Sequence, residues 1–176
     1  MGTGKAAVLV AEFAATWKLP VPAVLAERAA AGQPFSFELV RASVQDGIAT
    51  LTIDRPDAMN ALNEAVVAQL GEKFAAAAAD PAVRGIVLAG SGKAFVAGAD
   101  IRFFVRNIDA GDIQRIEDFT RDGQALLHAM DACPKPVVAR LHGLSLGGGV
   151  ELALACDWLI ATPAASLAFP ETGIGI

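Results

Sequence analysis

Cysteine, histidine, basic clusters and long apolar runs are all scarce in this sequence, and each scarcity excludes a class of protein. Two cysteines among 176 residues, Cys133 and Cys156, are too few for a disulfide framework, so we expect a reducing, cytoplasmic compartment. Hydrophobic residues make up 54% of the chain, yet no run approaches the roughly 18 consecutive apolar residues of a membrane span. The net charge is −5 and no basic block occurs. We therefore expect neither a membrane nor a nucleic acid as partner.

Motifs for metals and nucleotides are missing as well. The histidines, His128 and His142, stand alone and no CxxC pair occurs, so we expect no metal site. Residues 90–95, GSGKAF, begin like a dinucleotide-binding fingerprint, but Phe95 takes the place of its third glycine, and the P-loop spacing fails too. Ser145 in GLSLGG is separated from the next glycine by a leucine, which breaks the nucleophile-elbow pattern. These common signatures therefore assign no function.

The chain divides into two unequal parts. Residues 1–34 read as two short helices, because a proline pair interrupts an otherwise helical pattern. From about residue 37, apolar and polar residues alternate around Asp46-Gly47, which is a strong hairpin signal. Helices and strands then alternate, which indicates an α/β domain with crossover connections. We expect helices over residues 60–80 (with Asn60 as the cap), 112–133 and 150–156, and strands over residues 83–90, 135–143, 157–162 and 165–169.

Two loops rich in small residues are the candidate binding elements. Residues 92–100, GKAFVAGAD, and residues 142–149, HGLSLGGG, each follow a predicted buried strand and precede a helix. Ligands bind at the carboxyl ends of neighbouring strands in an open α/β sheet, and small residues and helix N-termini expose backbone N–H groups there. Two such loops side by side could direct two N–H groups at one oxygen. The alternative is that the glycines only permit tight turns or close packing of a helix on a strand.

Four sequence blocks of the second part occur in the order of a known family. They are GIATLTIDRPDAMNALN, GIVLAGSGKAFVAGADI, KPVVARLHGLSLGGGVELALACDWLIAT and ASLAFPETGIGI. On these blocks the sequence, from about residue 37 to its end, resembles the crotonase superfamily, the enoyl-CoA hydratase/isomerase proteins. The resemblance implies a ClpP/crotonase-like α/β spiral of βαβ units. It also implies an oxyanion hole that holds the thioester carbonyl of an acyl-CoA.

The resemblance assigns four catalytic positions. The backbone N–H groups of Ala99 and of Gly148, the middle one of three consecutive glycines, would form the oxyanion hole. Glu151 and Glu171 match the two glutamates of the hydratases: Glu151 would mainly handle the water and Glu171 the proton at the α-carbon, with protons shared between them. Double-bond isomerases of the family commonly manage with one glutamate. The presence of both therefore favours hydration of a trans-2-enoyl-CoA to a 3-hydroxyacyl-CoA, in fatty-acid β-oxidation.

The resemblance also implies where coenzyme A lies. Ala58 matches a residue whose backbone lies near the adenine, and Ala97, Asp100 and Ile101 match further contacts. Asp57 stands where the family often has a lysine that helps to hold a CoA phosphate, so that contact is not expected. Coenzyme A enters as part of the acyl-CoA substrate, and no separate cofactor is implied.

Both ends of the sequence depart from the family pattern. The sequence ends at Ile176, where the family continues into C-terminal helices that complete the pocket and make subunit contacts. Residues 1–36 resemble the end of the helical domain of 3-hydroxyacyl-CoA dehydrogenases. We therefore expect residues 37–176 to be a truncated crotonase domain, with its C-terminal helices missing, inside an internal fragment of a fused dehydrogenase/hydratase.

Assembly and activity are expected to follow the family. The full-length protein should form a trimer-based homo-oligomer, whereas the fragment should not turn over substrate. The alternative functions are enoyl-CoA isomerisation, another crotonase-type acyl-CoA reaction, or a non-catalytic binding module of the same fold. Retention of both glutamates and of both small donor residues argues against the last of these, because inactive relatives tend to lose them.

Overall fold

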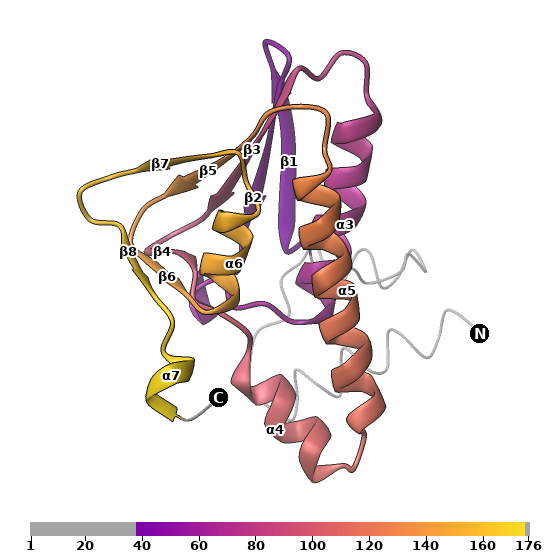
Figure 1. Cartoon of the computed structure of the whole chain (residues 1–176), viewed down its shortest axis with the longest axis vertical. Coiled ribbons are helices and arrows are strands. Elements are labelled where there is room, and N and C mark those ends of the chain that lie inside the picture. The colour runs from indigo at the N-terminus through magenta and orange to yellow at the C-terminus, as the bar shows by residue number, and fades with distance from the viewer. Residues whose placement is uncertain (1–37, 175–176) are drawn as a thin grey trace, which may run out of the picture. The chain divides into compact units, whose positions relative to one another are not determined.

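The computed structural model describes residues 38–174, whose course is shown in Figure 1. The helices predicted within residues 1–34 and the domain boundary near residue 37 lie outside these residues and stay predictions. No helix in the described part is both long enough and apolar enough to cross a membrane.

A five-stranded sheet runs through the described region. In spatial order its strands are β1 (Val40–Gln45), β2 (Ile48–Ile53), β3 (Gly85–Gly90), β5 (Val137–Leu141) and β7 (Trp158–Ala161). β1 and β2 form the predicted antiparallel hairpin, and the other neighbours pair in parallel. Asp46 and Gly47, between β1 and β2, both have positive φ, 51° and 77°, as the tight two-residue hairpin turn requires.

A second sheet brings the two predicted loops together. Its three parallel strands are β4 (Ala94–Val96), β6 (Leu144–Leu146) and β8 (Ser166–Ala168). β4 and β6 lie inside the segments that the sequence suggests are loops, because glycine and other small residues surround these two short strands closely. Ala94 pairs with Leu144 and Val96 with Ser145, so the two segments lie side by side as predicted.

The helices cover the sheet and its carboxyl end. They are the short 3₁₀ helix η1 (Pro56–Ala58) and the α-helices α3 (Glu64–Ala79), α4 (Ile101–Asp109), α5 (Ile113–Asp131), α6 (Gly148–Leu154) and α7 (Glu171–Ile174). α3 and α5 lie alongside each other, and α6 follows the short strand β6 (Figure 1). The predicted helices over residues 60–80, 112–133 and 150–156 correspond to α3, α5 and α6.

The prediction that Asn60 caps the first long helix is wrong. α3 begins after Asn63, whose Oδ1 accepts a hydrogen bond from a backbone N–H of the first turn at 3.0 Å. Asn60 is instead fully buried with a φ of 58°, and its side-chain amide donates to the carbonyl oxygens of Ser91 and Ala94 at 2.8 Å each. It therefore ties the loop before α3 to the turn between β3 and β4.

Burial is uneven across the two sheets. The core lies between the five-stranded sheet and helices α3 and α5, and its side chains include Leu51, Phe74, Leu88 and Met130. By contrast, every residue of β7 and β8 is exposed, including Trp158 and Ile160 at 60% and 63%.

Candidate active site

One cavity brings together three of the four predicted catalytic positions. Ala99, Gly148 and Glu151 all line a cavity of about 200 Å³, which we call the Gly148 cavity. Ala99 lies on the connection that follows β3, and Gly148 lies on the one that follows β5. The cavity therefore sits beyond the carboxyl ends of two neighbouring parallel strands, where open α/β sheets bind their ligands.

Hydrogen bonds between Leu62 and the two neighbours of Ala99 hold the Ala99 peptide in place. Leu62 N–H donates to the Gly98 carbonyl at 2.8 Å, and Asp100 N–H donates to the Leu62 carbonyl at 2.7 Å. In a parallel pairing of this kind, the residue between the two bonded neighbours directs its own N–H and C=O away from the partner strand. The Ala99 N–H is therefore fixed in direction and has no hydrogen-bond acceptor within residues 38–174.

Two of the three consecutive glycines are required by the fold. Gly147 has a φ of 46°, and a Cβ there would overlap the Glu171 carboxylate. A Cβ on Gly149 would overlap the carbonyl oxygen of Val96 and lie 2.8 Å from its Cβ, because α6 packs directly on β4. For these two positions the alternative reading, that glycine permits a turn or close packing, is correct.

Gly148 is different. A Cβ at this position would lie 3.4 Å from Leu62 Cδ1 and 3.6 Å from Glu151 Oε2, both ordinary van der Waals contacts, and its φ is not positive. Packing therefore does not require glycine here, and the missing side chain leaves open space inside the cavity. Gly148 is also the first residue of α6, so its N–H has no acceptor within the helix.

The two glutamates lie against successive glycines. Glu151 is exposed on α6, one turn after Gly148. Glu171 is the first residue of α7 rather than part of a loop, and its carboxylate abuts Gly147. Its Oε2 atom is buried and has no hydrogen-bond partner among the described residues. Since buried carboxylate oxygens are normally paired, this atom is available to a ligand or a proton.

The predicted coenzyme A positions lie on two adjoining segments. Ala58 ends η1, and the next residue, Met59, accepts a hydrogen bond from Ala97 N–H at 3.1 Å. Asp100 and Ile101 line an open hollow of about 590 Å³, together with Arg55, Arg102, Val105 and Arg106. Ile101 is 74% exposed, so its side chain is open to a ligand.

The carboxylate of Asp100, in contrast, is already hydrogen-bonded to other residues of the protein. Its Oδ2 accepts a hydrogen bond from Arg55 Nη2 at 2.7 Å, and its Oδ1 caps α4 by accepting from Arg102 N–H at 3.1 Å. Burial alone would raise the pKa of Asp100, but the hydrogen bond and the charge of Arg55, with a smaller contribution from Arg102, bring it below the ordinary value. Because Asp100 directly follows Ala99, this ion pair also holds the predicted donor peptide.

Sequence reasoning missed the contribution of α5 to the site. Six residues of this helix line the Gly148 cavity: Phe119, Thr120, Gly123, Gln124, Leu126 and Leu127. The available signal was a glycine in the middle of an amphipathic helix, which is unfavourable there unless the position has another purpose.

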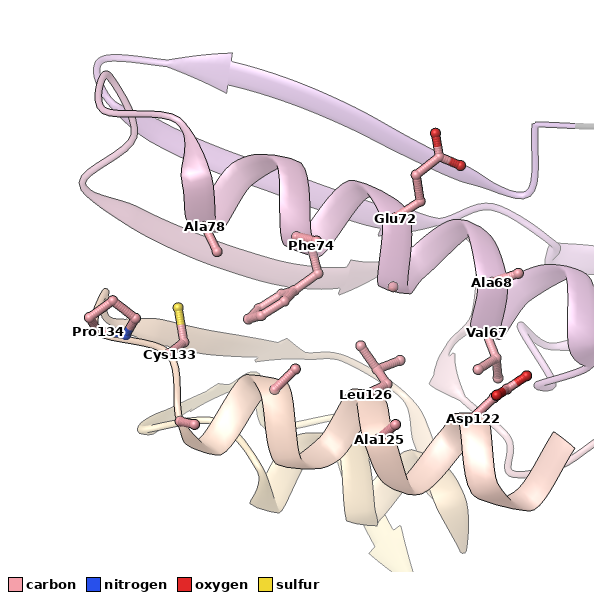
Figure 2. Close-up of a pocket in the computed structure, with 14 residues that line it drawn as sticks. Val67, Ala68, Glu72, Phe74, Ala78, Asp122, Ala125, Leu126, Cys133 and Pro134 are labelled. Carbon is pink, nitrogen blue, oxygen red and sulfur yellow. The ribbon is translucent and has the colours of Figure 1, made fainter. Parts of the chain in front are cut away.

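A further hollow, larger than the Gly148 cavity, lies between α3 and α5, and Figure 2 shows it in close-up. We call it the α3–α5 groove; it has a volume of about 500 Å³ and is lined by small residues that include Ala68, Gly71, Ala75, Ala78, Ala125, Ala129 and Ala132. Phe74 and Leu126 point toward one another across it, and Glu72 points away from α5 (Figure 2). None of the predicted site residues lines this groove.

Cys156 and His142, a thiol and an imidazole of the described region, each make a contact with a backbone carbonyl. Burial, with a smaller effect of Asp157, raises the pKa of the Cys156 thiol to about 12, and its Sγ donates to the Leu152 carbonyl at 3.3 Å. His142 Nε2 lies 3.0 Å from the Gly92 carbonyl oxygen. Neither side chain adds a catalytic group to the Gly148 cavity.

Known proteins with similar sequences are enzymes of the family that the sequence blocks resemble. A family model described as Enoyl-CoA hydratase/isomerase matches residues 48–176. The chain is 40% identical over 142 residues to a crotonyl-CoA hydratase of Syntrophomonas wolfei, covering 80% of this chain and 53% of that protein. It is 39% identical over 131 residues to a peroxisomal fatty acid beta-oxidation multifunctional protein of Oryza sativa, covering 74% of this chain and 18% of that protein.

Solved structures share the fold. The crystal structure of an enoyl-CoA hydratase from Thermoplasma volcanium matches with a TM-score of 0.72 and 34% identity, over 80% of this chain and 54% of that one. The predicted ClpP/crotonase-like α/β fold is therefore confirmed. The chain spans about half the length of the Syntrophomonas protein that it matches.

Proposed function

Because the chain belongs to the enoyl-CoA hydratase/isomerase family, we propose that its Gly148 cavity is the site of a hydratase. The proposed reaction adds water across a trans-2-enoyl-CoA and gives the 3-hydroxyacyl-CoA. The observation that carries the proposal is the meeting of Ala99, Gly148 and Glu151 in one cavity, with Glu171 against the neighbouring glycine. The crotonyl-CoA hydratase named among the relatives supports it.

In this proposal, two backbone N–H groups bind the thioester oxygen. Addition of water at C3 develops enolate charge on that oxygen, and the N–H groups of Ala99 and Gly148 donate to it. Fixed donors of this kind each contribute about 10²–10³ in rate. The Leu62 pairing supports this role for Ala99, because it leaves the N–H fixed in direction before substrate arrives.

In the same proposal, the two glutamates transfer the protons as water adds across the double bond. Glu151 orients the water and takes a proton as the hydroxyl oxygen bonds to C3, and Glu171 delivers a proton to C2. Each positioned acid or base contributes about 10²–10⁴ in rate. The unpartnered, buried Oε2 of Glu171 supports its role as a group that exchanges a proton with substrate.

In the same proposal, coenzyme A binds to the two segments that carry its predicted contact residues. The backbone around Ala58 and Ala97 receives the adenine, and Asp100 and Ile101 lie beside it, with Asp100 acting through its position rather than through a free carboxylate. Water and the enoyl thioester alone balance the product, so the proposed reaction needs no co-substrate; coenzyme A enters as part of the substrate, and we propose no separate cofactor.

The wider setting is proposed from the relatives and the composition. A place in fatty-acid β-oxidation is supported by the Oryza multifunctional protein, which is named for that process. The two free cysteines support a reducing cytoplasm. For the complete protein we propose a trimer-based homo-oligomer, which the membership of the family supports.

The test uses the complete product of the gene that encodes these residues. Loss of enoyl-thioester absorbance is followed with trans-2-enoyl-CoAs of several chain lengths, and the Glu151→Gln, Glu171→Gln double variant is the control. We expect hydration that the double variant abolishes. A folded protein that binds acyl-CoA and hydrates no chain length would overturn the proposal and favour a binding module; migration of a 3-enoyl double bond without hydration would favour an isomerase.

A further inference from the structure

One face of α5 forms a wall of the Gly148 cavity. Thr120, Gly123, Gln124 and Leu127 all line it, and their spacing places them on one side of the helix. Phe119 and Leu126 extend the same wall with apolar surface. The arginines of the site face the separate hollow at Ile101, so the α5 wall suits an acyl chain rather than the polar part of coenzyme A.

Gly123 is the one position on this wall that has no side chain, and nothing in the fold requires this. It lies inside α5, away from both ends, and it is not among the glycines with positive φ. A Cβ built on it meets no atom within 4 Å. Glycine is among the least favourable residues in a helix interior, so its presence here opposes the stability of α5 without a packing gain.

We propose that Gly123 sets the length of acyl chain that this site accepts, an inference that rests on the proposed hydratase function. The absent side chain leaves the α5 wall recessed between Thr120 and Leu127, and the distal part of a medium-length acyl chain occupies that recess. A side chain at position 123 would fill the recess and shorten the chain that fits. A pocket discriminates by about 10–200-fold for one methylene that does not fit.

Gly71 provides a matched control. It is also a glycine inside a long helix, α3, without positive φ and with no atom within 4 Å of a built Cβ. It differs in its place, because it lines the α3–α5 groove and not the Gly148 cavity. Gly71→Leu therefore reproduces the change in helix propensity and bulk without touching the proposed acyl wall.

The experiment measures binding before turnover. Saturated acyl-CoAs of four and ten carbons, which cannot be hydrated, and free CoA are titrated by calorimetry against the complete gene product and its Gly123→Leu and Gly71→Leu variants. We expect Gly123→Leu to weaken ten-carbon binding relative to four-carbon binding by about tenfold or more. We expect Gly71→Leu to leave that ratio unchanged within error.

The outcomes separate the inference from the proposed function. An unchanged ratio for Gly123→Leu, or equal weakening of both acyl-CoAs and free CoA, overturns the role of Gly123 whether or not the protein is a hydratase. A shifted ratio in a protein that hydrates nothing supports the role of Gly123 in binding and overturns the hydratase. If Gly123→Leu does not fold, Gly123→Ala, whose Cβ meets no atom, decides by the same ratio with a smaller shift.

Discussion

The Gly148 cavity and the α3–α5 groove share a wall, because Val67 and Leu126 line both, and yet only one of them has the features of an active site. The groove is the larger, at about 500 Å³ against about 200 Å³. Its carboxylates, Glu72 and Asp122, are exposed, and small apolar side chains make up most of the rest. Volume therefore does not identify the site.

What distinguishes the smaller cavity is its backbone. Ala99 and Gly148 bring N–H groups that have no acceptor in strand or helix, and a carboxylate stands one turn away on α6. Fixed donors beside a titratable group can stabilise a developing negative charge, whereas a smooth apolar groove can only bury surface. Substitutions on the two sides of the shared wall should therefore separate catalysis from packing.

The largest expected effect is on the glutamates. Glu151→Gln and Glu171→Gln should each lower the rate of hydration by about 10²-fold or more, because each removes a positioned acid or base. Acyl-CoA binding should change little, since the amide keeps the shape of the side chain. Glu72→Gln makes the same chemical change in the α3–α5 groove and should leave the rate unchanged. A normal rate for Glu151→Gln would reclassify that residue as structural.

The second-largest effect is expected for Gly148→Val. Its branched side chain would occupy the space beside Leu62 and Glu151 that the thioester needs, so hydration should fall by about 10²-fold and acyl-CoA binding should weaken with it. Free CoA has no thioester carbonyl and should bind nearly as before. A side-by-side titration of free CoA and a non-reactive acyl-CoA measures this, and equal weakening of both ligands would contradict the role of the Gly148 N–H.

Gly149→Ala is the control for that experiment. Its Cβ would overlap the Val96 carbonyl oxygen, so we expect loss of folded protein rather than a selective loss of acyl-CoA binding. A folded, selectively impaired Gly149→Ala protein would show that the glycines act as one unit, against the separate roles that the packing assigns to them.

The ion pair beside Ala99 should show its effect in the pH dependence of stability. The pKa of Asp100 is lower in the folded protein than its ordinary value of 3.8, so its contribution is present above that pH and is lost as the pH falls through the folded pKa. Asp100→Asn should lower the free energy of unfolding at neutral pH by about 1.5 kcal/mol, the lower end for a hydrogen bond to a charged group.

Urea denaturation at neutral and at acid pH measures this effect. The difference between Asp100→Asn and the unaltered protein should shrink as the pH falls below about 4. Glu64→Gln, which breaks the exposed pair with Arg115, should change stability far less, because exposed ion pairs are screened by solvent. A difference that stays constant with pH would mean that ionisation of Asp100 does not contribute to stability.

Much of the fold was predictable because it depends on local patterns. The hairpin at Asp46-Gly47 was predicted because its turn needs residues that tolerate positive φ. Apolar periodicity gave the approximate ranges of α3, α5 and α6, but no range for α4 or α7. Of the three strands of three residues, β8 was predicted, whereas β4 and β6 were missed because they lie inside segments rich in glycine and other small residues, which are typical of loops. The sequence pattern favours a cap at Asn60, but asparagine suits both a cap and a left-handed turn, and only tertiary contacts decide between these.

The features of the candidate site also differ in whether the sequence alone could predict them. The meeting of the two loops was predictable, since it needs only two neighbouring parallel strands, and the resemblance to the family singled out Ala99 and Gly148 within them. The separate reasons for the three glycines were not, because they depend on what each Cβ would touch. The Arg55–Asp100 pair and the α5 wall also join segments far apart in sequence, and no local pattern records such contacts.

The smallest expected effect lies on the groove side of the shared wall. Gly71→Ala should raise the free energy of unfolding by about 0.5–1 kcal/mol, because alanine is the better helix former. Its Cβ meets no atom within 4 Å, so no clash opposes that gain. Thermal or urea unfolding measures the change, and acyl-CoA binding, titrated in parallel, should stay the same. Weaker acyl-CoA binding in Gly71→Ala would show that the groove and the Gly148 cavity communicate through Val67 and Leu126, and the functional distinction between the two hollows would then be lost.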